Sequence, residues 1–413
     1  MLASAIAVLA MGLTMVVGQQ HWSHAVRILA VLGALTATAL ILDMSGARRD
    51  RLLLPITALL VTIGVVLISR IDGYLAAKQM VWVLVGCGAL IATYYLVDPP
   101  ANLANWKYLA GALAVALMVV CLIFAPEKNG ARLWLSFGGR FSFQPSEIAK
   151  LLMVVFLAGY VAEKSAILRR VGGKSGFSVL QGRYLAPMLV MVALCLALFV
   201  GQRDLGTAGL FFGLCLVMLY LATGRGSHAV LGVVVFALGV VVAYHTFPHL
   251  VRRMDSWLNP WADATGIGFQ PLQGIFALAE GGVGGAGLGL LHVGSRSLPE
   301  ASSDLIFAVL GQDLGLAGAV GVLMLYGVFV VAGFRIAWQA RESFEGLLAA
   351  GLTSMFALQA FIIVGGVLRV IPLTGLPLPM ISYGGTSMLA NFIALGLLLA
   401  ISRDNLPERP DSG

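Results

Sequence analysis

The sequence predicts an all-α polytopic membrane protein. Hydrophobic residues make up 59% of the 413 residues and charged residues only 11%, whereas a soluble domain carries about 25% charged residues. The apolar residues gather in runs long enough to cross a bilayer, which takes about 20 residues of helix. No stretch between these runs is long enough to build its own soluble core, so we expect one membrane domain.

Twelve apolar runs are candidate membrane-spanning helices. They lie at about 2–18, 26–43, 52–69, 79–97, 108–125, 147–162, 185–201, 207–223, 229–247, 304–334, 345–368 and 387–402. The N-terminal run has no basic residue before it, which favours a first membrane helix over a cleaved signal. The run at 304–334 is too long for one upright helix. We therefore expect its first part, DLIFAVLGQDLG, to form a half-buried segment that leads into the span.

The basic residues of the loops predict the orientation. With twelve spans both termini share one side, and the basic loops 44–51 and 163–184 lie on that side, which we interpret as cytoplasmic. The long loops 126–146 and 248–303 are then outside. Several arginines oppose the positive-inside trend, which indicates an anionic substrate at the outer leaflet. They are Arg132, Arg140, Arg203, Arg252, Arg253, Arg296 and Arg369.

The formal net charge of +7 does not indicate nucleic-acid binding. The basic residues are scattered over short loops, without a long basic run or interleaved aromatic residues, so we expect no nucleic-acid partner. The four cysteines lie singly in apolar runs and the six histidines are scattered. We predict neither disulfides nor a metal site built from these residues.

Two short polar segments stand at the starts of predicted spans. In QPSEIAK, Glu147 falls in the first helical turn, and Lys150 follows it on the same face at a spacing of three. A local ion pair at a helix start explains this pattern, but a charge inside a bilayer helix costs about 2.5–3.5 kcal/mol and usually has a role. In GQRDLGTA, Asp204 is placed to cap the helix that follows it.

Two longer segments interrupt the apolar pattern. Residues 259–289 read NPWADATGIGFQPLQGIFALAEGGVGGAGLG, whose glycines imply sharp bends or close backbone approach to a ligand. Together with SRSLPEASSDLIFAVLGQDLG at 295–315, this segment brings five carboxylates to one rim: Asp263, Glu280, Glu300, Asp304 and Asp313. RVIPLTGLPLPMISYGGTS at 369–387 has non-helical residues that we expect to line a cavity.

Taken together, these segments resemble the SEDS family (shape, elongation, division and sporulation proteins), typified by RodA and FtsW. The resemblance runs from about Lys78 to Ser402 in six ordered blocks. They are KQMVW, GARLW…FQPSEIAK, QRDLGTA, NPWAD…GIGFQ…GG…GLG, LPE…SDLIFAVLG and PLTGLPLPMISYGG. This chain departs from the family pattern at several positions: Arg203 stands where Pro is common, and Gln312 and Asp313 replace two glutamates.

The resemblance implies a SEDS-type bundle of about ten core helices, to which residues 1–45 add two helices at the front. Residues 46–403 then form the SEDS membrane domain, with the large outer loop before the span near 304–334, and residues 404–413 a short cytoplasmic tail. The implied activity is peptidoglycan glycosyltransferase: polymerisation of lipid II into β-1,4 glycan at the outer face of the bacterial inner membrane. The implied partner is a class B penicillin-binding protein, a transpeptidase. The family's essential aspartate corresponds to Asp263.

The chemistry of glycan growth suggests roles for further residues. Asp263 would accept the proton of the acceptor hydroxyl, and we expect partial burial to raise its pKa. Lys150, with Glu147, would support it, and Arg132, Arg140 and Arg203 would bind the diphosphate. A divalent cation could share that last role. Further candidate substrate-binding residues are Asp204, Gln270, Glu300, Asp304 and Ser382.

Two other functions remain open from the sequence. A lipid II flippase would explain the twelve spans and the Glu147/Lys150 pair, but not carboxylates and glycines that gather in outer loops instead of at the midplane. A non-catalytic scaffold for a transpeptidase would tolerate Asp263→Asn but not deletion of the loops.

Overall fold

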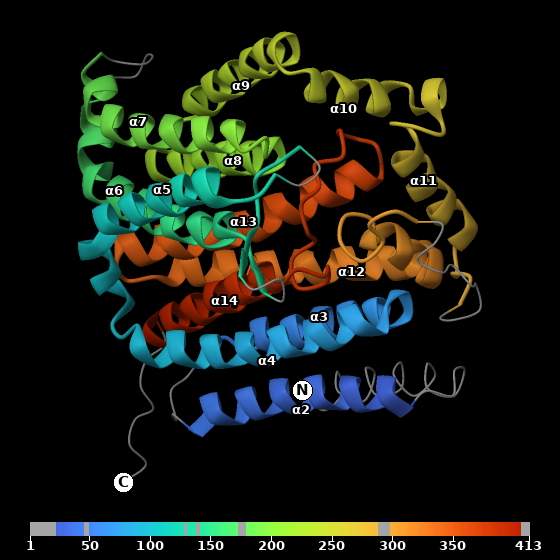
Figure 1. The fold of residues 1–413 in the computed structure, drawn as a ribbon. Helices are drawn as coiled ribbons and strands as arrows, with labels where there is room; N and C mark the ends of the chain where they lie inside the picture. The colour runs from blue at the N-terminus through green and yellow to red at the C-terminus, as the bar shows by residue number, and fades with distance from the viewer. Residues whose placement is uncertain are drawn as a thin grey trace. The chain divides into compact units, whose positions relative to one another are not determined.

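The computed structural model describes residues 22–44, 49–127, 130–137, 141–171, 179–287 and 298–405. Its elements are almost all helices (Figure 1). The first predicted span, 2–18, and most of the tail at 404–413 lie outside the described residues, as does Arg140. Within the described part, ten helices are long and apolar enough to cross a membrane, which confirms an all-α polytopic protein.

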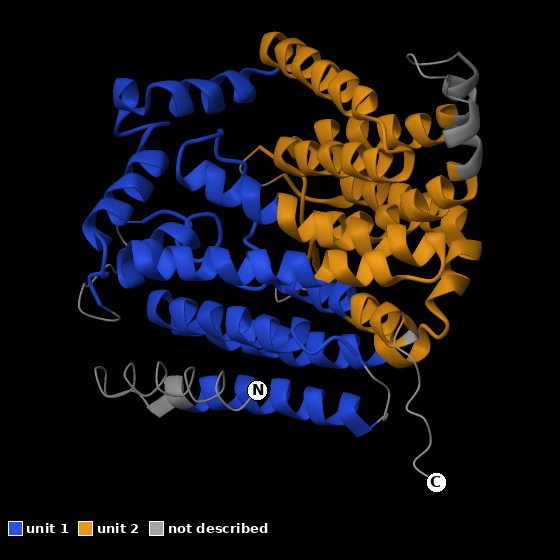
Figure 2. Cartoon of the chain, turned by 180° about the vertical axis from the view of Figure 1, so that it is seen from behind, with its two compact units in different colours: residues 1–92, 247–332, 359–395 blue, residues 93–246, 333–358, 396–413 orange. Residues whose placement is uncertain are grey.

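The helices divide into two units, coloured separately in Figure 2. Unit 1 comprises residues 1–92, 247–332 and 359–395, and unit 2 comprises residues 93–246, 333–358 and 396–413.

Unit 1 contains the N-terminal helices and the long loop before residue 306. Its helices α2 (Trp22–Met44) and α3 (Leu53–Ile71) pack together, and α4 (Gly73–Leu96) begins in this unit. Loop 248–303 holds α10 (Pro248–Leu258), the 3-10 helix η2 (Pro260–Asp263) and α11 (Phe269–Gly281). Residues 248–281 are therefore largely helical, and Asp263 lies at the end of a short turn.

Unit 2 contains the helices between residues 100 and 246. They are η1 (Pro100–Trp106), α5 (Lys107–Phe124), α6 (Pro145–Val171), α7 (Val179–Gly201), α8 (Leu205–Thr223) and α9 (Gly226–Thr246). Helix α6 packs on α5 and α8. Loop 126–146 contains a two-stranded antiparallel hairpin, β1 (Leu135–Phe137) and β2 (Phe141–Phe143), in which Ser136 pairs with Ser142. The sequence did not predict this hairpin.

Three long helices close the chain: α12 (Ile306–Gln339), α13 (Ser343–Val367) and α14 (Gly385–Asn405). Helix α12 is two helices joined across Gly315, whose φ of 68° and ψ of −170° are not helical. Residues 305–313 before this kink are all buried. The first part of the 304–334 run thus forms a separate segment as predicted, and this segment is more deeply buried than expected.

The glycine run at 281–287 packs backbone against backbone on the kink of α12, within unit 1. Ala286 N donates to Gln312 O at 2.9 Å, and Leu316 N donates to Gly282 O at 2.9 Å. A Cβ atom at Gly285 would overlap the Asp313 carbonyl oxygen. The sequence predicted sharp bends or close approach to a ligand. The bends are present, since Gly282, Gly285 and Gly287 have positive φ, and the close approach is to a neighbouring stretch of backbone.

Candidate active site

Asp263 ends the 3-10 helix η2 in unit 1, and its carboxylate is fixed by the turn that follows. Oδ1 accepts a hydrogen bond from Gly266 N at 2.9 Å, and Oδ2 accepts one from Ile267 N at 3.2 Å. Each carboxylate oxygen keeps further acceptor capacity. The side chain is exposed, so the partial burial expected from the sequence is wrong.

Two glycines allow this turn to close. A Cβ atom at Gly266 would overlap Oδ2 of Asp263, and a Cβ atom at Gly268 would overlap the Pro260 carbonyl oxygen. Gly268 N also donates to the Asp263 carbonyl oxygen at 3.0 Å. The spacing of Asp263, Gly266 and Gly268 in the motif therefore has a steric reason: larger residues would displace the carboxylate.

Glu147 and Lys150 form a buried ion pair in the first turns of α6, in unit 2. Lys150 Nζ lies 2.9 Å from Glu147 Oε1, and the two side chains are 2% and 1% exposed. Pro145 begins the helix at a position that needs no backbone donor. The predicted pairing on one face is confirmed. Support of Asp263 by Lys150 would join residues of different units and stays a prediction.

Asp204 caps helix α8, as the sequence predicted. Its Oδ1 accepts from Thr207 N at 3.0 Å, and the side chain is buried. Burial raises the pKa of the carboxyl above its ordinary value; the hydrogen bonds from Thr207 and the charge of Lys150 oppose the rise, and the charge of Glu147 adds to it. Asp204, Glu147 and Lys150 are thus three buried ionisable side chains of unit 2.

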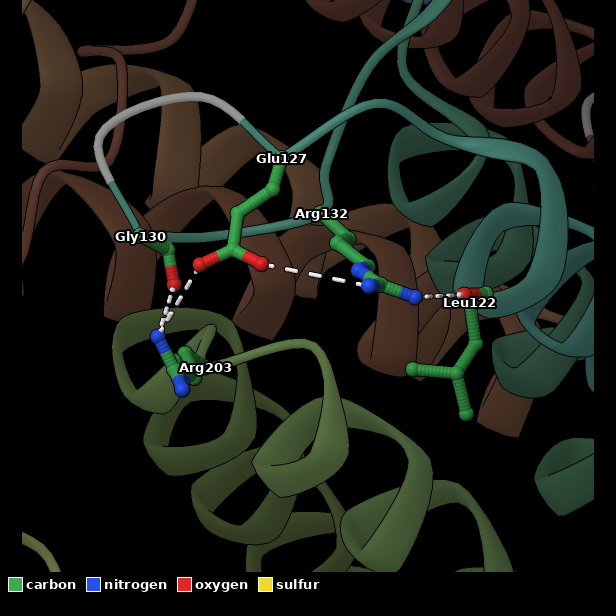
Figure 3. A network of polar contacts seen from close by, with 5 residues as sticks. All are labelled: Leu122, Glu127, Gly130, Arg132 and Arg203. Atoms are coloured by element: carbon green, nitrogen blue, oxygen red, sulfur yellow. Dashed lines mark hydrogen bonds and ion pairs between the residues drawn. The ribbon is translucent and has the colours of Figure 1, made fainter.

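Arg132 and Arg203 meet at a shared carboxylate in unit 2 (Figure 3). Glu127 Oε1 lies 3.3 Å from Arg203 Nη1, and Glu127 Oε2 lies 3.8 Å from Arg132 Nη2. All three side chains are about half exposed. The prediction brought the two arginines to one place but missed Glu127. The position of Glu127 in PEKNGAR, five residues before Arg132, could have indicated that it pairs with these arginines.

Asp304 is half-buried ahead of α12, and its pKa is raised to about 6. Burial is the main cause and the negative charge of Glu300 adds to it, while the Ser303 hydrogen bond and the charge of Arg253 oppose it. Glu300 has a φ of 50° and accepts a hydrogen bond from Ser303 Oγ at 3.1 Å. Of the five predicted carboxylates, these two lie close enough to influence each other.

The other predicted residues of unit 1 take separate places. Asp313 is buried and pairs with Arg70 of α3, while Glu280 accepts a hydrogen bond from Gln312 Nε2 at 2.5 Å. Gln270 lies half-buried in the first turn of α11.

Ser382 is buried and satisfied within the protein. Its hydroxyl donates to Ser303 O at 2.7 Å and accepts from Leu378 N at 2.8 Å. The structure thus gives Ser382 a role in holding loop 369–387 to residue 303. Direct substrate contact by this hydroxyl stays a prediction.

No group of three or more His, Cys, Asp or Glu side chains within the described ranges could hold a metal ion. A divalent cation that shares in diphosphate binding would not need such a group, because oxygens of the substrate would supply some of its ligands. That expectation stays a prediction. The described residues therefore offer an exposed, fixed carboxylate, Asp263, in unit 1. Unit 2 offers the buried side chains Glu147, Lys150 and Asp204 and, separately, the accessible guanidinium groups of Arg132 and Arg203.

Comparison with known proteins gives consistent matches. A family model described as a cell cycle protein, covering FtsW, RodA and SpoVE, matches residues 50–406. The peptidoglycan glycosyltransferase RodA of Mycobacterium leprae is 40% identical over 375 residues, which cover 87% of this chain and 80% of that protein. The stage V sporulation protein E of Bacillus subtilis is 34% identical over 368 residues, which cover 86% and 97% of the two chains.

Solved structures also match. A chain of a peptidoglycan synthase complex that coordinates polymerization and crosslinking superposes with a TM-score of 0.71 and 26% identity, covering 86% of this chain and 98% of that one. The rod shape determining protein RodA of Thermus thermophilus superposes with a TM-score of 0.60 and 26% identity, covering 87% and 98%.

Proposed function

This chain belongs to the FtsW, RodA and SpoVE family, and from that premise we propose that it polymerises lipid II into β-1,4 glycan strands. The relatives at 40% identity carry the name peptidoglycan glycosyltransferase. The apolar helices embed the chain in a membrane as a multi-pass protein. We place the reaction at the outer face of the bacterial cytoplasmic membrane, with both termini cytoplasmic, from the loop charges.

One observation carries the proposed chemistry: the carboxylate of Asp263 is exposed and held by two backbone N–H groups. A base must be accessible to the acceptor and fixed in direction. In the proposed step, the acceptor 4-hydroxyl oxygen attacks the anomeric carbon of the donor. The bond from that carbon to the diphosphate oxygen breaks with inversion. Asp263 takes the hydroxyl proton, and undecaprenyl diphosphate leaves.

Unit 2 would supply the positive charge for the leaving group. Arg132 and Arg203 are accessible, and a guanidinium matches phosphate oxygens with paired donors. Arg140 is a third candidate from the sequence. Lys150, balanced by Glu147, would support the catalytic carboxylate, and a divalent cation could assist diphosphate departure.

We further propose a transpeptidase partner, a class B penicillin-binding protein, for cell elongation or division. The support is that one structural neighbour belongs to a complex that coordinates polymerization and crosslinking.

The test is glycan synthesis from labelled lipid II by the purified full-length protein in liposomes, with and without its cognate transpeptidase. The proposal expects glycan polymer from the wild type and none from Asp263→Ala at equal protein level. A parallel assay follows transfer of lipid II between leaflets. Transfer without polymer would favour a flippase, and neither activity in any pairing would favour a scaffold.

A further inference from the structure

Glu127 occupies the position between Arg132 and Arg203 that an external anion would take. Each of its carboxylate oxygens faces a different guanidinium, Oε1 toward Arg203 and Oε2 toward Arg132 (Figure 3). One carboxylate thus serves two cations, which leaves the three side chains with a net positive charge. Carboxylate and phosphate oxygens suit the same guanidinium donors.

The backbone around this position is built to hold the two arginines. Arg203 Nη1 donates to Gly130 O at 2.8 Å, Arg132 Nη1 donates to Leu122 O at 3.4 Å, and Arg132 N donates to Gln202 O at 3.2 Å. Arg203 has a φ of 61°, a left-handed backbone conformation that residues other than glycine seldom adopt. The arginines are therefore anchored independently of Glu127.

Glu127 itself is held weakly. The oxygen–nitrogen distances of 3.3 and 3.8 Å exceed the roughly 2.7–2.9 Å of a strong charge-assisted hydrogen bond. The side chains are 48–55% exposed, and ion pairs of such exposure contribute little to stability. An anion that makes shorter contacts with the same two guanidinium groups would displace the Glu127 carboxylate at small cost.

We propose that Glu127 is a built-in competitor at a phosphate-binding site formed by Arg132 and Arg203. The ligand is a lipid-borne phosphate or diphosphate, and Glu127 swings aside when it binds. This inference rests on the proposed function insofar as the ligand is the diphosphate of the polyprenyl substrate.

Direct binding tests the inference without requiring turnover. Undecaprenyl diphosphate is titrated into the purified full-length protein in detergent, and its Kd is measured by tryptophan fluorescence or thermophoresis. Phosphatidylglycerol is titrated in parallel. The variants are Glu127→Gln, Arg203→Gln and the double variant, with Glu342→Gln as control because Glu342 is an exposed glutamate outside this cluster. Melting temperatures check that each variant is folded.

The expected result is that Glu127→Gln lowers the Kd by about two- to fivefold, the worth of an exposed ion pair. Arg203→Gln should raise the Kd by about tenfold. The double variant should bind less tightly than Glu127→Gln but slightly more tightly than Arg203→Gln, because Arg132 is still freed of Glu127. Glu342→Gln should match the wild type. Tighter binding of undecaprenyl diphosphate alone assigns the site to the substrate; tighter binding of both lipids assigns it to phosphate headgroups generally.

An unchanged or higher Kd for both lipids in Glu127→Gln would overturn the inference and make Glu127 a structural link between its two arginines. These experiments measure binding and not turnover, so their outcome does not depend on whether the protein polymerises lipid II. A protein that forms no glycan but shows the expected shifts would retain the phosphate site and lose the polymerase assignment.

Discussion

Gly266 lies directly against the carboxylate that we assign as the catalytic base: its N–H donates to Asp263 Oδ1 at 2.9 Å, and a Cβ atom at position 266 would overlap Oδ2. The glycine thus acts through Asp263 as a positioning residue. Its backbone does not need glycine for conformational reasons, because its φ is not in the left-handed range. What it provides is space.

Gly266→Ala should therefore reduce glycan polymerisation by about 100-fold, the cost of a displacement of roughly 1 Å in a catalytic group. The melting temperature should change little, because the turn is exposed. Gly284→Ala is the matched control, since a Cβ atom there would meet open space. Equal activity of Gly266→Ala and wild type would show that the position of the Asp263 carboxylate does not limit the reaction.

Breaking the buried pair in α6 should destabilise the protein. Lys150→Met leaves Glu147 buried, at 1% exposed, without its ion-pair partner, which costs about 3–5 kcal/mol of unfolding free energy. The double variant Glu147→Gln/Lys150→Met should recover most of this loss. The measurement is denaturant unfolding of the purified protein.

The Glu163–Lys164 ion pair, later in the same helix, provides the control for Lys150→Met. Lys164→Met disrupts the more accessible Glu163–Lys164 pair and should cost about 0–1 kcal/mol. If the double variant is stable and still polymerises lipid II, Lys150 has a purely structural role, and its assigned support of Asp263 is wrong.

Asp304 predicts a pH-dependent contribution to stability. Its pKa is raised from 3.8 to about 6 in the folded protein, so between these values the native state binds more protons than the unfolded state. The contribution of this group is then complete below about pH 4 and declines as the pH rises through about 6. Asp304→Asn removes the decline, so its stability relative to the wild type should rise between about pH 4 and pH 6, by at most about 3 kcal/mol.

Glu300→Gln tests whether the titration of Asp304 causes the decline in stability. It removes the neighbouring negative charge that raises the pKa of Asp304 in the folded protein, so the decline should end at a lower pH and be smaller than in the wild type. Thermal unfolding at half-unit pH steps measures both effects. An Asp304→Asn profile parallel to that of the wild type would show that Asp304 does not titrate in this range.

The helices were predictable because each one is specified locally. Runs of about 20 apolar residues mark the described spans, and the excess length at 304–334 indicated the break found at Gly315. The hairpin at 135–143 escaped prediction because three-residue strands show too little alternation to be recognised. Helix α7 was predicted at 185–201, which coincides with its apolar part, Leu185–Gly201.

The site was predictable in its residues more than in its contacts. A local turn fixes Asp263, and a spacing of three pairs Glu147 with Lys150. In contrast, Glu127 meets Arg203 across 76 positions of sequence, and Ser382 bonds to Ser303 across 79. Such contacts depend on how the helices pack, and no local pattern encodes them. The same limit explains the exposure of Asp263, which was expected to be partly buried.

The most direct test of the central claim compares three acidic residues of unit 1 in one lipid II polymerisation assay. Asp263→Asn removes the base but keeps a side chain that can accept a hydrogen bond from the turn, while Asp304→Asn and Glu280→Gln make the same chemical change elsewhere. We predict a loss of about 10²–10⁴-fold for Asp263→Asn and substantial activity in the other two. Wild-type rates from Asp263→Asn, with loss in Asp304→Asn or Glu280→Gln, would contradict the account and assign the base to that residue.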